Sequence, residues 1–290
     1  MMHSRQRRRT SMRNPVVVGV SGTSAGLAAA RLAAREAVSR DCQLRVIHAF
    51  TWPNPGASED YEDARRAASR VVEEAVASAK RSTPRVRVAG QLVDGPPDRV
   101  LVRLSRTSAL LVLAGDDLAT APSLPLSSVL PLTVGHSWCP VMVTHGPRTP
   151  AGALMVAVDG SASGLLALRY AAAESRRRRV GVEVVHVVRE FAGRHEEEGH
   201  RVLAASIAAV PELGRVRTLV LAGAPGPTLV HAGAHARVLV IGPRGTRGTG
   251  LLGSVAREVM HRAACPAIFV HGRAIPAQRT PSGSSGALAR

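Results

Sequence analysis

An apolar run followed by a glycine-rich basic loop, VLVIGPRGTRGTGLLGS, occupies residues 238–254 of the chain. The aliphatic run at 238–241 is typical of a strand that is buried on both faces of a parallel sheet. The glycines that follow can adopt a positive φ and can approach a ligand closely, because they carry no Cβ. Residues 255–260 have the composition of a helix, so the stretch predicts a strand, a loop and a helix start.

A loop of this kind favours an anion. The first turn of a helix has free N–H groups and the positive end of the helix dipole, and Arg244 and Arg247 add positive charge beside it. Phosphate is the simplest ligand for such a loop. A tight surface turn without a ligand is the alternative, and this stretch alone does not decide between the two.

Length and composition limit the class of protein. A chain of 290 residues is long enough for two domains of roughly 140 residues. The run at 16–20 after the N-terminal arginines is too short for a signal peptide, and no apolar run reaches membrane-spanning length, so we expect a cytoplasmic protein without membrane contact. Cys42, Cys139 and Cys265 form no metal-binding pattern, and we expect buried thiols.

The formal net charge of +17 is unevenly distributed. About half of the excess lies in two segments without acidic residues, the tails at 1–13 and 273–290, which we expect to be disordered. Charge alone supports only weak, salt-sensitive association with polyanions. We therefore expect no specific nucleic-acid partner.

Apolar runs alternate with helical patterns along the first half. Strands are predicted at 16–20, 43–50, 86–93, 109–113 and 139–144. Helices are predicted at 25–39, 61–82 and 97–105, and a helix before the last strand is less certain because Pro122, Pro125 and Pro131 crowd that segment. This alternation indicates an α/β fold with a doubly wound parallel sheet.

The second half repeats the plan of the first. Asp159 matches Ser21 and His186 matches His48 at an offset of 138 residues, whereas the Gly-x-Pro segment at 223–229 matches 95–101 at 128 and Cys265 matches Cys139 at 126. The second copy has therefore lost about ten residues between its second and third strands and two more in the glycine loop. Residues 147–152 are the natural linker.

The repeated motifs together resemble the universal stress protein family in its tandem two-domain form, over about 14–146 and 152–272. They are Val-x-Val-Asp-Gly-Ser, Gly-x-Pro-x-x-x-Leu, Gly-x-x-Gly, Gly-Ser-Val and Cys-Pro-x-x-x-Val. The resemblance implies a flavodoxin-like (adenine nucleotide alpha hydrolase-like) fold in each half. It also implies pairing through the final strands, either in a homodimer or as an intramolecular pseudo-dimer.

The resemblance also implies a ligand, which is ATP or a related adenine nucleotide. In nucleotide-binding members the first-strand aspartate lies near the adenosine, and a Gly-x-x-Gly-x9-Gly-Ser loop holds the phosphates and ribose. The binding residues that the resemblance implies are Ala157, Asp159, Gly242, Gly245, Gly253, Ser254 and Val255. We add Arg244 because its positive charge lies in the same loop.

The two halves depart from the family pattern to different degrees. In the first half Ala114 and Asp117 replace the first two glycines, Ser127 and Ser128 replace the Gly-Ser pair, and Ser21 replaces the aspartate. Asp116 and Asp117 would repel a phosphate by about 1 kcal/mol or more per close pair, so we expect no nucleotide there. The second half keeps every signature residue, but residues 246–252 form a loop of seven where the family has nine. We expect binding there, with weak or altered binding left open.

Several of these residues have structural alternatives. His48 and His186 are more often packed than catalytic at such positions, Asp159 and Ser254 could cap helices, and the arginines at 176–179 are typical of a solvated helix end. Spacing assembles neither a catalytic triad nor a metal site. We expect a protein that binds rather than catalyses, with an unknown protein partner. The alternative is an interaction protein in which both pockets are degenerate.

Overall fold

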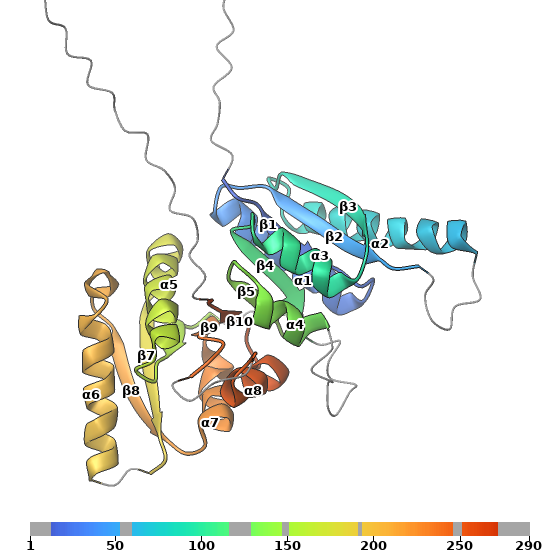
Figure 1. Ribbon diagram of the computed structural model, residues 1–290. Helices are drawn as coiled ribbons and strands as arrows, with labels where there is room; N and C mark the ends of the chain where they lie inside the picture. The colour runs from blue at the N-terminus through green and yellow to red at the C-terminus, as the bar shows by residue number, and fades with distance from the viewer. Residues whose placement is uncertain are drawn as a thin grey trace, which may run out of the picture.

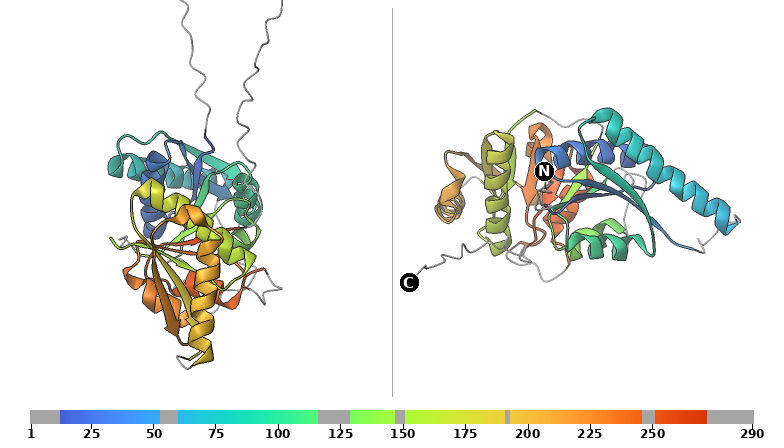
Figure 2. Two further views of the ribbon diagram at one scale, coloured as in Figure 1. Left: turned by 90° about the vertical axis from the view of Figure 1, so that its left-hand side faces the viewer. Right: turned by 90° about the horizontal axis from the view of Figure 1, so that it is seen from above.

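In the computed structural model of the protein, the described residues are 13–52, 60–115, 129–146, 151–190, 193–245 and 251–271. Most of both tails, the linker at 147–150, the acidic pair at 116–117 and the loop at 246–250 lie outside these ranges. Within them, strands from both halves form one ten-stranded sheet that carries helices on both faces (Figures 1 and 2).

The first half alternates strands and helices as predicted. Its elements are β1 (Val16–Gly19), α1 (Ser24–Ser39), β2 (Leu44–Phe50), α2 (Tyr61–Ser82), β3 (Val88–Asp94), α3 (Pro97–Ser105), β4 (Leu110–Ala114), α4 (Val129–His136) and β5 (Val141–Thr144). The uncertain helix before the last strand is α4. It tolerates Pro131 because this residue lies in the first turn, where backbone N–H groups have no partner within the helix.

The second half repeats the order with shorter connections. Its elements are β6 (Leu154–Ala157), α5 (Ala162–Arg178), β7 (Val182–Val188), α6 (Arg194–Ala208), η2 (Pro211–Leu213), β8 (Arg217–Ala222), α7 (Pro225–Ala232), η3 (Gly233–His235), β9 (Val238–Ile241), α8 (Ser254–Arg262) and β10 (Ala267–Phe269). Helix α6 has 15 residues where α2 has 22. The predicted deletion between the second and third strands therefore falls largely in this helix.

The strands run in the order β3-β2-β1-β4-β5-β10-β9-β6-β7-β8. Pairing is parallel within each half, and the strand order reverses between β1 and β4 and again between β6 and β9, where ligands of such sheets bind. The predicted doubly wound domains in tandem are confirmed. When the strands are numbered from 1 to 5 within each half, both halves have the order 3-2-1-4-5. This is the order of a Rossmann-like sheet, and it differs from the flavodoxin order 2-1-3-4-5.

The strand registers confirm the repeat offsets. Val16 pairs with Leu110 in the first half, and Leu154 pairs with Val238 in the second, which reproduces the offsets of 138 and 128. Alternate strand residues point to two core layers, one beneath α1, α2, α5 and α6 and the other beneath α3, α4, α7 and α8. Both layers continue from one half into the other.

The two halves meet at an antiparallel pair of final strands, β5 and β10. Met142 pairs with Ile268, its own counterpart in the repeat, so a pseudo-twofold axis passes through this pair. His145 Nε2 lies 2.9 Å from the Met260 carbonyl oxygen, and His271 makes the matching bond to the Val134 carbonyl. The final strands therefore pair as predicted, and they do so within one chain, which is the intramolecular form of the two alternatives.

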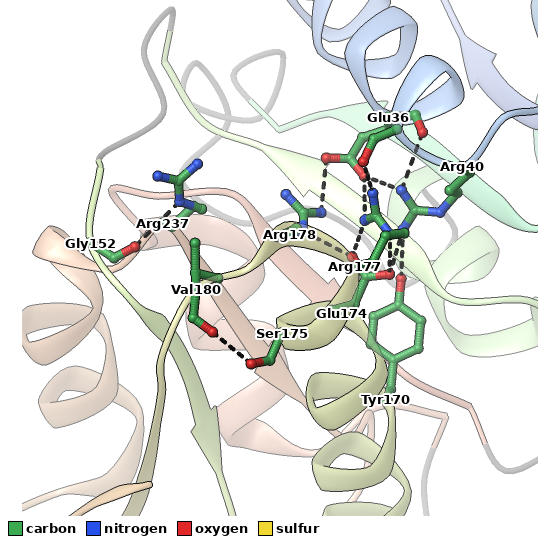
Figure 3. A network of polar contacts seen from close by, with 11 residues as sticks. Glu36, Arg40, Gly152, Tyr170, Glu174, Ser175, Arg177, Arg178, Val180 and Arg237 are labelled. Atoms are coloured by element: carbon green, nitrogen blue, oxygen red, sulfur yellow. Dashed lines mark hydrogen bonds and ion pairs between the residues drawn. The ribbon is translucent and has the colours of Figure 1, made fainter. Parts of the chain in front are cut away.

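A buried ionic cluster joins α1 to α5 across the same axis (Figure 3). Arg40 lies 2.9 Å from Glu174, and Arg178 lies 2.8 Å from Glu36 in an ion pair without hydrogen-bond geometry. Each glutamate also pairs with the arginine of its own helix, and Arg177 joins both carboxylates. The prediction that residues 176–179 form a solvated helix end is therefore wrong for Arg177 and Arg178.

Candidate functional site

The predicted binding residues of the second half converge at the carboxyl ends of β6 and β9, which are neighbouring strands. Ala157 ends β6 and Asp159 follows it. Gly242, Arg244 and Gly245 follow β9, and Gly253, Ser254 and Val255 surround the start of α8. The fold thus brings the segment after β6 together with two neighbouring segments that lie more than eighty residues later in the sequence.

Asp159 is held by the start of α5. Its Oδ1 accepts a hydrogen bond from the backbone N–H of Ser161 at 3.1 Å and another from the Ser161 hydroxyl. Ser161 itself caps the helix, since its Oγ accepts from Gly164 N–H at 3.0 Å. Asp159 therefore orients the N-capping residue and is not itself the N-cap.

Gly242 and Gly245 are needed for close approach. A Cβ built on Gly242 would lie 2.2 Å from Ser163 Oγ, and one on Gly245 would lie 2.8 Å from Asp159 Oδ2. None of Gly242, Gly245 and Gly253 has a positive φ. The expectation that these glycines serve left-handed turns is therefore wrong for the described part of the loop. What they provide is room beside the Asp159 carboxylate and the first turn of α5.

The two ends of the glycine loop are joined by a backbone bond. Gly253 N–H donates to the Pro243 carbonyl at 2.9 Å, which brings the start of α8 against Gly245. Gly253 is the N-capping residue of α8 and has no side chain to cap it, while Ser254 is the exposed first residue of the helix. The alternative that Ser254 is the N-cap is wrong, and this helix start has no side-chain cap.

A pocket of about 400 Å³ lies beside this loop, and residues from both halves line it. Ser163, Leu166 and Arg244 come from the second half, Gly135 comes from α4 of the first half, and His271 follows β10. Sequence reasoning missed Ser161, Ser163 and Gly135. The spacing of Asp159 and the two serines could have indicated an Asx-type turn, whereas the contribution of α4 depends on the pairing of the halves.

The corresponding site of the first half is partly described. Ser21, in the place of Asp159, has its hydroxyl 3.3 Å from that of Thr23, and Thr23 caps α1 through Gly26 N–H as Ser161 caps α5. Ala114 ends β4 in the position of Gly242. Asp116, Asp117, Ser127 and Ser128 lie outside the described residues, so their predicted effect on a ligand stays a prediction.

The two strand histidines have matching backbone partners. Nδ1 of His48 lies 2.7 Å from the Val20 carbonyl oxygen, and Nδ1 of His186 lies 2.8 Å from that of Val158. A carbonyl can only accept, so in each ring Nδ1 carries the proton. The expectation of packed, hydrogen-bonded histidines is confirmed.

The described part of the chain gives little support to metal binding, reactive thiols or membrane spanning. It contains no group of His, Cys, Asp and Glu residues that could hold a metal ion. All three cysteines are buried, as predicted, and burial raises the pKa of the Cys139 thiol to about 12 and that of Cys265 to about 11, so both are protonated at neutral pH. None of the described helices has the length and apolar character needed to cross a bilayer.

Both halves of the chain are similar in sequence to known proteins. The model of the universal stress protein family matches residues 12–145 and again 152–271. Universal stress protein Rv2005c of Mycobacterium tuberculosis is 31% identical over 285 residues, covering 87% of this chain and 95% of the relative. Universal stress protein Rv2623 of the same organism is 29% identical over 286 residues, with the same coverage.

A solved structure has the same architecture. The crystal structure of a universal stress protein from Archaeoglobus fulgidus aligns with a TM-score of 0.69 and 16% identity, covering 90% of this chain and 99% of that one. At this identity the likeness concerns the fold. Because the family model matches both halves and the relatives align along nearly their whole length, the chain belongs to the universal stress protein family and carries two of its domains in tandem.

Proposed function

We propose that this universal stress protein binds an adenine nucleotide, ATP in the first instance, at one site per chain in its second domain (residues 152–272). The first domain (14–146) takes none. The observation that supports this most directly is the approach of Gly245 to Asp159, which is too close for a Cβ on Gly245. The loop that would carry the phosphates therefore meets the residue that is expected near the adenosine. The protein responds to stress through this bound state, not through catalysis.

The chemistry of the site fits the charge of the ligand. The uncapped start of α8 offers backbone N–H groups and the positive end of its dipole, and Arg244 is exposed next to it. The Asp159 carboxylate is an acceptor and suits the sugar or base, while the phosphates require donors and positive charge. Both kinds of partner lie close to Gly245, since a Cβ on Gly245 would be 2.8 Å from Asp159 Oδ2 and a Cβ on Gly253, at the start of α8, would be 3.7 Å from Gly245 N.

Calorimetry with ATP tests the proposal. The parent is expected to bind with a stoichiometry near one, and Asp159→Ser, which introduces the residue of the first domain, is expected to weaken binding by roughly tenfold or more through loss of a charged hydrogen-bond partner. Ser21→Asp is the matched control and should leave the titration unchanged. A stoichiometry near two would contradict the assignment to one domain.

The alternative function is that of an interaction protein without nucleotide. The glycine loop of the second domain, two residues shorter than the family pattern, favours it. Protein purified without added nucleotide, denatured and assayed for released nucleotide, separates the two. Absence of both released nucleotide and calorimetric heat would support the interaction protein.

A further inference from the structure

Helix α4 of the first domain packs against the end of the glycine loop of the second domain. Its residue Gly135 is buried, and a Cβ built on it would lie within 2.8 Å of Cγ, Cδ1 and Cδ2 of Leu251. The branched end of the Leu251 side chain therefore occupies the space that a larger residue at 135 would fill. Leu251 lies two residues before Gly253, the N-capping residue of α8, so the loop is packed directly on the other domain.

The glycine at position 135 is explained by this contact and not by the backbone. Gly135 has no positive φ and lies within α4, where alanine would be the better helix former. The offset of 126 that relates Cys139 to Cys265 makes His261 its counterpart, and that residue is half-buried. The first domain therefore has room for a side chain of the loop at a position where the second domain carries an imidazole.

The contact of Leu251 with Gly135 acts on the part of the loop that would hold the phosphates. Gly253 N–H donates to the Pro243 carbonyl at 2.9 Å, which ties the start of α8 to the glycines after β9. Leu252, between Leu251 and Gly253, is 7% exposed and belongs to the same core layer as residues of α4. The N–H groups at the start of α8 are therefore held in place partly by the first domain.

The first domain also holds α8 near its other end. Nε2 of the buried His145, which follows β5, lies 2.9 Å from the carbonyl oxygen of Met260 in the last turn of α8. This helix has nine residues, so contacts before its start and in its last turn fix both its position and its direction relative to β9. A loop that is ordered before the ligand arrives binds more tightly, because no free energy is lost in ordering it.

From these contacts we infer that the first domain positions the nucleotide loop of the second domain, and that Gly135 is a positioning residue that acts through Leu251. The inference rests on the nucleotide site proposed above. It gives the first domain a function in ligand binding although no nucleotide is proposed for its own site. One domain of the tandem chain supports the ligand site of the other.

Gly135→Ala tests this role with the smallest possible side chain. It should favour α4 as a helix but displace Leu251, and calorimetry on the full chain should show ATP binding weakened by about tenfold, because the loop must then be ordered on binding. Leu251→Ala removes the contact from the other side and should also weaken binding. His136→Ala, at the exposed neighbouring position of α4, is the matched control and should leave the affinity unchanged.

The double variant separates positioning from direct contact with the ligand, since Gly135 also lines the pocket of about 400 Å³ beside the loop. In a Leu251→Ala background the steric conflict is absent, so Gly135→Ala should cause no further loss of ATP affinity. An equal loss in both backgrounds would show that a side chain at 135 meets the ligand itself, and would overturn the inference.

Amide hydrogen exchange without nucleotide gives a readout that does not depend on ATP. In Gly135→Ala and in Leu251→Ala, the Gly253 N–H that bonds to the Pro243 carbonyl should exchange roughly tenfold faster. The N–H of Leu239, in the central part of the sheet, should exchange as in the parent. Circular dichroism checks that the variants fold, and Leu251→Ala carries the test alone if Gly135→Ala does not.

The two readouts separate failure of the inference from failure of the proposed function. If the parent binds no ATP, the proposed function fails, and the exchange of Gly253 still decides whether the first domain orders the loop. Unchanged exchange of Gly253 in the folded variants would overturn the inference. Faster exchange without weaker binding, in a parent that binds ATP, would overturn it as well.

Discussion

Gly245 is the residue at which the two domains differ most clearly in charge and volume. Its missing side chain leaves room beside Asp159, and the first domain carries Asp117 at the matching position. Gly245→Asp should therefore abolish ATP binding, because the new Cβ would lie 2.8 Å from Asp159 Oδ2 and the new carboxylate would repel both Asp159 and the phosphates. Calorimetry with ATP measures the loss.

The matched control for this variant lies in the first domain. Asp117→Gly should leave the calorimetric titration of the second domain unchanged, since it alters only the corresponding position of the other copy. Undiminished ATP binding after Gly245→Asp would show that the nucleotide does not use the space beside Asp159.

Helices α1 and α5 are joined by glutamates and arginines at equivalent positions in the repeat, and by Arg177, whose counterpart is Ser39. Glu36 and Glu174 are 5% and 7% exposed and share Arg40, Arg177 and Arg178, so removal of either carboxylate leaves three guanidinium groups, each at most 19% exposed, with a single counter-charge. We expect Glu36→Ala and Glu174→Ala each to lower the free energy of unfolding by about 3 kcal/mol. Chemical denaturation measures both values.

An exposed pair provides the control for these variants. Arg66 and Asp63 form an ion pair in which both side chains are more than 60% exposed, and Asp63→Ala should produce no measurable change. Clearly unequal effects of the two glutamate variants would contradict the pseudo-twofold equivalence of the cluster.

The same cluster should make the stability depend on pH. Burial alone would raise the pKa of Glu174, but Arg40, Arg177 and Arg178 outweigh it and lower the pKa below the ordinary value. The stabilisation is therefore present above the pKa of an unfolded glutamate, about 4.3, and is lost as the pH falls through the lower pKa of the folded state. Thermal unfolding from pH 7 to pH 3 should show a smaller decrease for Glu174→Gln than for the parent.

The helices illustrate what the sequence could and could not predict. The bounds of α2 and α3 follow from helical spacing and from the flanking prolines and match the structure residue for residue. The arginines of α5 looked solvated because their partner Glu36 lies on a helix more than a hundred residues earlier. Periodicity within one helix carries no information on such a partner, although the shared offset of 138 relates Glu36 to Glu174.

The candidate site shows the same limit. The resemblance to the family pattern predicted the three segments that meet beside β6 and β9, because the family motif itself names residues in each of them. The approach of Gly135 to the loop, where a Cβ would lie 2.2 Å from Leu251 Cγ, depends on how α4 of one domain packs against the other. Only the paired fold determines that contact.

The two domains form one continuous sheet whose centre is the pair of final strands. Both core layers cross this seam, and His145 and His271 bond to backbone carbonyls of the opposite domain. Pairing covers the backbone groups that each final strand would otherwise expose at an edge. The halves thus complete each other within one chain, as two subunits of a symmetric dimer would.

Met142 and Ile268, which face each other on the pseudo-twofold axis, offer the sharpest test of this arrangement. Both side chains are fully buried, so a carboxylate at either position would be desolvated without a partner and should separate the seam. Ile268→Glu should therefore speed amide hydrogen exchange in β5 and β10 together, because the two strands share one ladder, while β2 and β7 keep their protection. Met142→Glu should produce the same pattern, since the axis makes the two positions equivalent, and Met142→Leu should leave exchange unchanged because it nearly conserves volume. Faster exchange in only one of the two final strands, or equal loss of protection throughout both domains, would show that the seam is not an independent, symmetric junction.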